Sequence, residues 1–149
     1  MRKIETILVA EDDSADAFFL KRAFSKVGVP TSLHFVRDGQ EVLDYLFGEG
    51  QFADRQAYPG PDLLLLDLKM PRVDGFQVLD WVRRQPRLKR LPVIIFSSSP
   101  QDKDINRAYD LGANSYLVKP HSTEELVALV EKLKNYWIET NQKPNAFAD

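Results

Sequence analysis

The chain has 149 residues, with no cysteine and only two histidines. The lack of cysteine excludes disulfides, thiolate metal sites and cysteine nucleophiles. His34 and His121 do not form a pair with the spacing of metal ligands, and we interpret both as structural or solvent-facing. Any metal in this protein is therefore expected to be bound by oxygen atoms.

Long apolar runs and a strong excess of one charge are also missing. No apolar run approaches the roughly 20 residues that span a bilayer. Glu5 places an acid near the start of the chain, where a signal peptide would be apolar. The formal net charge of −2 provides no basic face for nucleic acid. We therefore expect a cytoplasmic protein that binds neither membranes nor nucleic acids and has protein partners.

The composition, with 44% hydrophobic and 28% charged residues, is typical of one compact domain. Five short runs rich in leucine and β-branched residues predict strands at 4–10, 33–36, 63–66, 93–96 and 116–118. The third and fourth runs are apolar throughout, which is typical of a parallel sheet whose two faces are both covered by helices.

Capping signals between these runs predict five helices. The expected starts are Ser14, Asp38, Asp74, Ser99 and Ser122. Strands that alternate with helices, joined by right-handed crossovers, predict an α/β fold with a (βα)₅ doubly wound parallel five-stranded sheet. We expect a surface loop at 48–60, a domain over 1–138 and a C-terminal extension over 139–149.

Polar residues follow four of the predicted strands. Glu11 and Asp12 come after the first, Asp67 after the third, Ser97 at the end of the fourth and Lys119 after the fifth. Ligands of open α/β sheets bind outside the carboxyl ends of the strands, so these side chains are expected to share one site.

Crowded carboxylates raise one another's pKa values unless a cation lies among them, and Mg²⁺ is commonly held by one or two carboxylates and a phosphate oxygen. We assign Asp12 and Asp67 as direct Mg²⁺ ligands, with Glu11 acting through water. The backbone carbonyl of Lys69 supplies a further oxygen, and Mn²⁺ can substitute for Mg²⁺.

This set of residues suits phosphoryl transfer. Asp67 can attack a phosphoryl group to give an acyl phosphate, while the metal and Lys119 neutralise the equatorial oxygens. The Ser97 hydroxyl can donate a hydrogen bond to the new phosphate. That contact exists only in the phosphorylated state, so it can bias a conformational switch.

Four sequence blocks resemble the signature blocks of bacterial two-component response regulator receiver domains. They are 7–13, 65–75, 96–98 and 116–120. The resemblance covers about Lys3 to Lys134 and implies a flavodoxin-like receiver fold with strand order 2-1-3-4-5. It also implies a sensor histidine kinase as phosphoryl donor and a cis bond at Lys119–Pro120. Tyr116 is implied to be a switch residue that turns inward when Ser97 engages the phosphate.

Two features depart from minimal receivers. Glu11 stands where many members have Asp, and the loop at 48–60 and the C-terminal tail are both longer. These longer segments resemble the stand-alone regulators of bacterial phytochromes, particularly cyanobacterial ones. A bacterial phytochrome is therefore the expected kinase, and signalling is expected to pass through protein contacts of this domain itself.

Two alternatives compete with this interpretation. A degenerate receiver acting as a constitutive binding module would be expected to lack one of the acids or the lysine, and all are present. A phosphatase with an aspartyl nucleophile needs a second acid two residues later, where this chain has Lys69. We expect no activity on external substrates. The chain should catalyse only its own phosphoryl transfer and a slow self-dephosphorylation, because Lys69 offers no acceptor and Ser99 is expected to cap a helix.

A homodimer is also expected, through the fourth helix, fifth strand, fifth helix and tail. The apolar stripe of the fifth helix continues through Tyr136, Trp137 and Ile138, and Phe147 adds an aromatic residue in the tail. These residues are expected to need a second surface, which a two-fold interface would supply. The alternative is that Trp137 and Phe147 fold back on their own domain.

Overall fold

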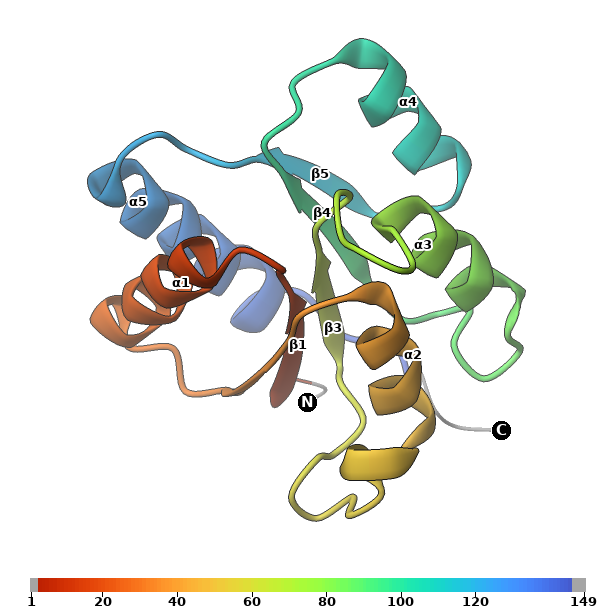
Figure 1. The fold of residues 1–149 in the computed structure, drawn as a ribbon. Helices are drawn as coiled ribbons and strands as arrows, with labels where there is room; N and C mark the ends of the chain where they lie inside the picture. The colour runs from red at the N-terminus through yellow and green to blue at the C-terminus, as the bar shows by residue number, and fades with distance from the viewer. Residues whose placement is uncertain (1–2, 146–149) are drawn as a thin grey trace.

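The computed structural model describes residues 3–145, and they form a parallel sheet covered by helices on both faces (Figure 1). The strands are β1 (Thr6–Ala10), β2 (Ser32–Val36), β3 (Leu63–Leu66), β4 (Val93–Ser97) and β5 (Ser115–Val118). Neighbouring strands pair in parallel in the order β2-β1-β3-β4-β5. The predicted (βα)₅ fold and its strand order are confirmed.

The helices are α1 (Ser14–Val27), α2 (Gly39–Phe47), α3 (Gly75–Arg84), α4 (Asp102–Asp110) and α5 (Thr123–Leu133). A 3₁₀ turn (Gly50–Phe52) follows α2, and a π-helical segment (Lys134–Ile138) continues α5. In Figure 1, α1 and α5 lie side by side on one face of the sheet, whereas α2 and α3 lie on the other. No helix in the described part of the chain is long and apolar enough to cross a membrane.

The uniformly apolar strands separate two hydrophobic cores. Leu64 and Leu66 pack with residues of α2, α3 and α4, whereas Leu63 and Leu65 pack with residues of α1 and α5. All four leucines of β3 are buried. Because successive side chains of a strand point to opposite faces, a strand covered on both sides has no polar face, and this explains the absence of alternation.

Three of the five predicted helix caps are confirmed. The side chains of Asp38, Asp74 and Ser122 accept hydrogen bonds from backbone amides in the first turns of α2, α3 and α5. Each bond satisfies one of the amides that a helix start leaves without an intrahelical partner.

The other two predicted caps are wrong. Asp13, not Ser14, accepts the amide of Asp16 at the start of α1, because Asp13 is the residue with extended backbone there. Helix α4 begins at Asp102, after an N-cap residue that makes no side-chain cap bond. The Ser99 hydroxyl lies before this helix and donates to the Asp104 carboxylate at 2.5 Å.

The segment 48–60 is a surface loop, as expected, but it packs against the domain through its aromatic residues. Phe52 is buried, and its ring centroid lies 5.0 Å from that of Tyr45 and 5.2 Å from that of Tyr58. Arg55 donates to the Tyr45 carbonyl at 2.8 Å. The aromatic rings supply apolar area that a Gly-rich and polar loop otherwise lacks.

The C-terminal part of α5 and the π-helical segment cover their own sheet. Ile138 is 5% exposed, and Trp137 packs against the same core as α1 and α5. The expectation that these residues need another surface is therefore wrong for Ile138, which is buried in its own domain, whereas Trp137 is only partly buried there. Tyr136 remains 54% exposed. Phe147 lies outside the described residues.

The cis bond at Lys119–Pro120 that the resemblance implies is not found. Residues 3–145 contain no cis peptide bond. The trans form present here is the one that an X–Pro bond intrinsically favours, by about 0.5–1 kcal/mol.

Candidate functional site

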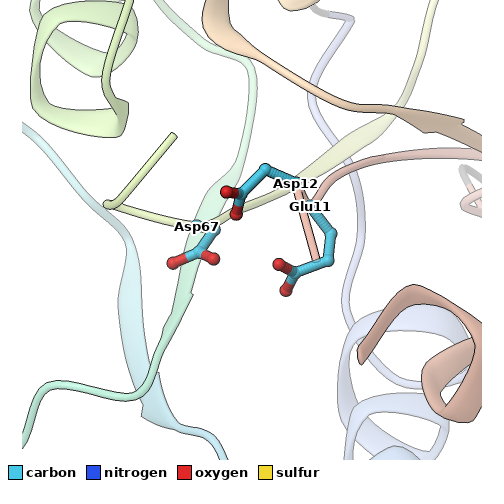
Figure 2. Close-up of side chains that lie close together, drawn as sticks. All are labelled: Glu11, Asp12 and Asp67. Carbon is cyan, nitrogen blue, oxygen red and sulfur yellow. The ribbon is translucent and has the colours of Figure 1, made fainter. Parts of the chain in front are cut away.

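Three acidic side chains meet at the carboxyl edge of the sheet. Glu11 and Asp12 directly follow β1, Asp67 directly follows β3, and β1 pairs with β3 through Ala10 and Leu66. One carboxylate oxygen from each acid lies within 4.8 Å of the others. Figure 2 shows the three side chains close together. The prediction that these acids cluster at the strand ends is confirmed.

The backbone around Asp67 is fixed by close packing of α3 against the end of β3. The Asp67 amide donates to the Ala10 carbonyl at 3.1 Å, and the Gly75 amide donates to the Leu68 carbonyl at 2.9 Å. A Cβ atom on Gly75 would lie 2.2 Å from the Asp67 carbonyl oxygen. Only glycine therefore allows this approach, which holds Asp67 at the edge of the sheet.

Lys119 brings a positive charge to the acidic cluster from the end of β5. Its Nζ atom lies 2.5 Å from Glu11 Oε1, 3.0 Å from Asp67 Oδ2 and 3.0 Å from Asp16 Oδ2. Burial opposes the charged ammonium, but hydrogen bonds and charges of Glu11 and Asp67 outweigh it and raise the pKa of Lys119. Lys119 is therefore charged, and its attraction to Glu11 and Asp67 links the end of β5 to the ends of β1 and β3.

Glu11 is the most strongly perturbed acid of the cluster. Its side chain is 2% exposed, and burial raises the pKa of Glu11 to about 7, with the charge of Asp67 acting in the same direction. The hydrogen bond from Lys119 opposes this rise. One lysine thus does not fully compensate the crowded carboxylates, and the site favours a further positive charge.

The donor set and its surroundings fit a hard dication. All three acids offer oxygen, which Mg²⁺ and Mn²⁺ prefer. Asp12 is exposed and lines a hollow of about 550 Å³ together with Lys69, Asp74 and Arg107, so an ion with its waters has access from solvent. The Lys69 amide donates to Asp67 Oδ1 at 3.4 Å, which keeps the Lys69 segment beside the cluster.

Ser97 and Tyr116 both contact Ser99 in the loop between β4 and α4. The Ser97 hydroxyl is fully buried and accepts the Ser99 amide at 3.2 Å. The Tyr116 hydroxyl donates to the Ser99 carbonyl at 2.8 Å. The Lys119 amide also donates to the Ser97 carbonyl at 2.8 Å, which places Ser97 beside the end of β5. The two predicted switch residues are therefore both hydrogen-bonded to the same loop.

Asp16 is a contact of Lys119 that reasoning from the sequence missed. It lies in the first turn of α1, and its side chain is 47% exposed. It comes four residues after Asp12, in the helix that follows the first predicted strand. That spacing is the signal that could have placed it at the same edge of the sheet.

Comparison with known proteins identifies the family. The family model of the response regulator receiver domain matches residues 7–131. The chain belongs to the response regulator receiver family. The matched segment of this receiver includes Glu11, Asp12, Asp67, Ser97 and Lys119.

Two curated relatives span nearly the same length as this receiver. It is 40% identical over 138 residues to the "probable methanogenesis regulatory protein FilR2" of Methanothrix harundinacea, covering 93% of this chain and 86% of that protein. It is 32% identical over 142 residues to response regulator Rcp1 of Synechocystis, covering 95% of both proteins.

Solved structures show the same fold. The phosphorylated cyanobacterial phytochrome response regulator RcpA has a TM-score of 0.86 and 36% identity, covering 97% of this receiver and 99% of that chain. The Mn²⁺-bound form of response regulator Rcp1 has a TM-score of 0.84 and 31% identity, covering 94% of this receiver and 99% of that chain.

Proposed function

We propose that this receiver is a single-domain response regulator that accepts a phosphoryl group on Asp67 from a sensor histidine kinase, in a reaction that requires Mg²⁺. The observation that carries the proposal is the contact of one partly buried ammonium, that of Lys119, with Asp67 and Glu11 inside a cluster of three acids. The phosphorylated state of RcpA and the Mn²⁺-bound form of Rcp1 support it.

The chemistry assigned to Asp67 is nucleophilic attack on phosphorus. A carboxylate oxygen of Asp67 forms the new bond to phosphorus while the bond to the donor's leaving nitrogen breaks, and that nitrogen keeps the electron pair. Lys119 already lies 3.0 Å from Asp67 Oδ2, so its N–H groups can bind an oxygen of the transferred group. The contribution of Lys119 is electrostatic and needs little movement.

Asp12 and Asp67 would hold Mg²⁺ directly, with Glu11 binding through water and the backbone carbonyl of Lys69 as a further ligand. When bound, the dication supplies charge neutralisation for the phosphoryl oxygens. Mn²⁺ offers the same charge and accepts the same oxygen ligands, so it can substitute.

The proposed switch works through the loop that contains Ser99. Once Asp67 is phosphorylated, the Ser97 hydroxyl donates to a phosphate oxygen and moves toward Asp67. Ser99 follows because its amide donates a hydrogen bond to the Ser97 hydroxyl. The hydrogen bond from the Tyr116 hydroxyl to the Ser99 carbonyl is then broken. The displaced Tyr116 ring turns inward, so the β4–α4 loop and the face of β5 change together.

The acyl phosphate is expected to be long-lived in the isolated protein. Fast hydrolysis needs a side chain that accepts a proton from the attacking water. The Lys69 ammonium has no acceptor, and the Ser99 hydroxyl is engaged with Asp104. We expect a half-life of minutes to hours, which corresponds to barriers of about 22–24 kcal/mol. Intact mass measured over time after removal of the phosphodonor checks this, and decay within seconds contradicts it.

The kinase is proposed to be a bacterial phytochrome, which would meet this receiver in the cytoplasm. The similarity to RcpA over 97% of the chain supports this choice. Purified bacterial phytochromes loaded with phosphate should transfer it faster to this receiver than sensor kinases of other classes do. Equal transfer from unrelated kinases would contradict a phytochrome partner.

The test of the whole proposal is incubation with acetyl phosphate and Mg²⁺, followed by intact mass measurement. The wild-type protein should gain one phosphoryl group, and the gain should vanish with EDTA and in Asp67→Asn. A constitutive binding module would gain none, and a phosphatase would hydrolyse the donor without accumulating a phosphorylated form. Phosphorylation of Asp67→Asn at the wild-type rate would show that another residue is the acceptor.

A further inference from the structure

We propose that Asp16 is a positioning residue that holds the Lys119 ammonium against Asp67 during phosphoryl transfer. The inference rests on the proposed function and assigns a role to a residue outside the three-acid cluster. It follows from how the Lys119 ammonium is surrounded.

Lys119 has three carboxylate partners, and a lysine ammonium has three N–H donors. Glu11 and Asp67 belong to the acidic cluster at the strand ends, whereas Asp16 reaches Lys119 from the first turn of α1. The Asp16 contact, at 3.0 Å, is as short as the contact with Asp67. The ammonium is therefore held from two sides, by the cluster and by α1.

The two kinds of partner respond differently when the site is used. Asp67 becomes an acyl phosphate and loses its carboxylate charge, and Glu11 shares its charge with the proposed dication. Asp16 is not part of the three-acid cluster, so neither the phosphoryl group nor the proposed dication is assigned to it. It is thus the partner of Lys119 that stays constant through the reaction, which is what a positioning residue requires.

Both ends of this contact are anchored in the backbone. The Asp16 amide donates to the Asp13 carboxylate at 2.9 Å, which fixes the start of α1. The Lys119 amide donates to the Ser97 carbonyl at 2.8 Å, which fixes the end of β5. The Lys119 side chain is 13% exposed, so it has little room to move if Asp16 holds it and more if Asp16 is lost.

The negative charge of Asp16 would also repel an anionic phosphodonor. This repulsion would slow phosphorylation, whereas the positioning of Lys119 would speed it. Loss of that charge alone would speed the reaction at low salt, and the gain would disappear at high salt because exposed charges are screened. Loss of positioning would slow the reaction at both salt concentrations. The direction of the change therefore separates the two roles.

The experiment measures the phosphorylation rate against acetyl phosphate concentration in excess Mg²⁺, at low and high salt. Asp16→Asn should lower the rate at saturating donor by about threefold, within the range measured for exposed ion pairs. Asp16→Glu, which keeps the carboxylate, should recover part of the loss. Glu124→Gln is the matched control, because Glu124 is an exposed first-turn acid of α5 that is not among the ion-pair partners of Lys119.

A second readout does not depend on the reaction. In metal-free protein labelled with ¹⁵N-lysine, the Lys119 ammonium protons should exchange with water faster in Asp16→Asn than in wild type or Glu124→Gln. An unchanged saturating rate and unchanged exchange in Asp16→Asn would overturn the proposal, as would a rate increase confined to low salt. If the wild-type protein gains no phosphate, the proposed function fails instead, and the exchange measurement still decides whether Asp16 positions Lys119.

Discussion

At the scale of single residues, Glu11 has a pKa that is shifted from its usual value into the neutral pH range. Burial raises it from the usual 4.5 to about 7. The folded protein therefore holds a proton at pH values where the unfolded chain has released it. Stability from this residue is fully present below about pH 4.5 and is lost as the pH rises through about 7.

The first prediction follows from this loss of stability with rising pH. In EDTA, the free energy of unfolding of the wild-type protein should fall between about pH 5 and pH 8 relative to that of Glu11→Gln. The side chain introduced by this substitution is an amide that does not titrate, so the difference between the two proteins isolates Glu11. Urea unfolding at several pH values measures it. Parallel pH profiles of the two proteins would show that Glu11 is not perturbed in this way.

The second prediction concerns metal affinity. Asp12 is exposed beside the hollow at the strand ends, whereas Glu11 is buried and paired with Lys119. Asp12→Ala should therefore weaken Mg²⁺ binding more than Glu11→Ala, because only Asp12 is assigned as a direct ligand. Isothermal titration of both variants compares the two affinities, and equal affinities would remove the distinction between direct and water-mediated ligands.

At the scale of secondary structure elements, Arg83 joins the end of α3 to the segment before β4 and to the segment before β5. Its guanidinium donates to the carbonyls of Gly112 at 2.9 Å and Leu91 at 2.7 Å, and to the side-chain oxygen of Asn114 at 2.8 Å. The same Asn114 oxygen accepts the Val93 amide at the start of β4. One side chain thus joins α3, β4 and the segment before β5.

The third prediction is that Arg83→Met lowers the free energy of unfolding by about 2–4 kcal/mol, because partly buried acceptors lose hydrogen bonds to a charged donor. Arg84→Met is the matched control on the same helix. Arg84 pairs only with Asp80 on the exposed surface in the described part of the chain, so stability should hardly change. Chemical unfolding of both variants checks this. Equal losses of stability in the two variants would mean that helix propensity, not the hydrogen bonds of Arg83, causes the loss.

The elements themselves were largely predictable from the sequence, and the failures have physical causes. Uniform apolar runs identify buried parallel strands because no residue there contacts water. Helix starts were predicted less well. Asp13 and Ser14 are both good caps, and their backbone conformation, which the sequence does not reveal, decides between them. The burial of Phe52 and the role of Arg83 depend on contacts between distant segments, which no local pattern encodes.

At the scale of the whole molecule, the site was predictable because the fold class places every strand end at one edge. Glu11, Asp12, Asp67 and Lys119 all lie there as expected. Asp16 was missed because its contact with Lys119 joins residues 103 positions apart in the chain, a property of the packed molecule. The roles of Ser97 and Tyr116, the ligands of Mg²⁺ and the division of the chain at residue 138 stay predictions.

The tail after the π-helical segment lies against the domain as far as the structure describes it. Lys143 forms an ion pair with Asp62 at 2.5 Å, and Lys3 donates to the Glu139 carbonyl. Asp62 also accepts the amides of Glu5 and Thr6, so the tail is joined to the start of β1. Residues 139–145 therefore lie along the amino edge of the sheet, opposite the acidic site.

A surface suited to a second copy remains on β5, α5 and the π-helical segment. A groove of about 680 Å³ is lined there by Leu117, Val118, Leu129, Tyr136 and Trp137. Tyr136 is 54% exposed and Val118 is 39% exposed. Tyr116 is the neighbour of Leu117 on β5 but packs against the opposite core, so a movement of the loop at Ser99 on phosphorylation would reach this face through the backbone of β5. A two-fold interface would place each Tyr136 against the same patch of the partner.

The fourth prediction is that the protein forms a homodimer through this face and that phosphorylation tightens it. Tyr136→Glu should weaken the dimer, because the interface would then bury a charge on each subunit without a partner for it. Phe47→Glu is the control, since Phe47 is 41% exposed on α2, away from β5 and α5. Sedimentation equilibrium at micromolar concentration, with and without acetyl phosphate and Mg²⁺, measures the dissociation constants. A wild-type protein that stays monomeric in both states would rule out the dimer, and equal weakening by Tyr136→Glu and Phe47→Glu would place the interface elsewhere.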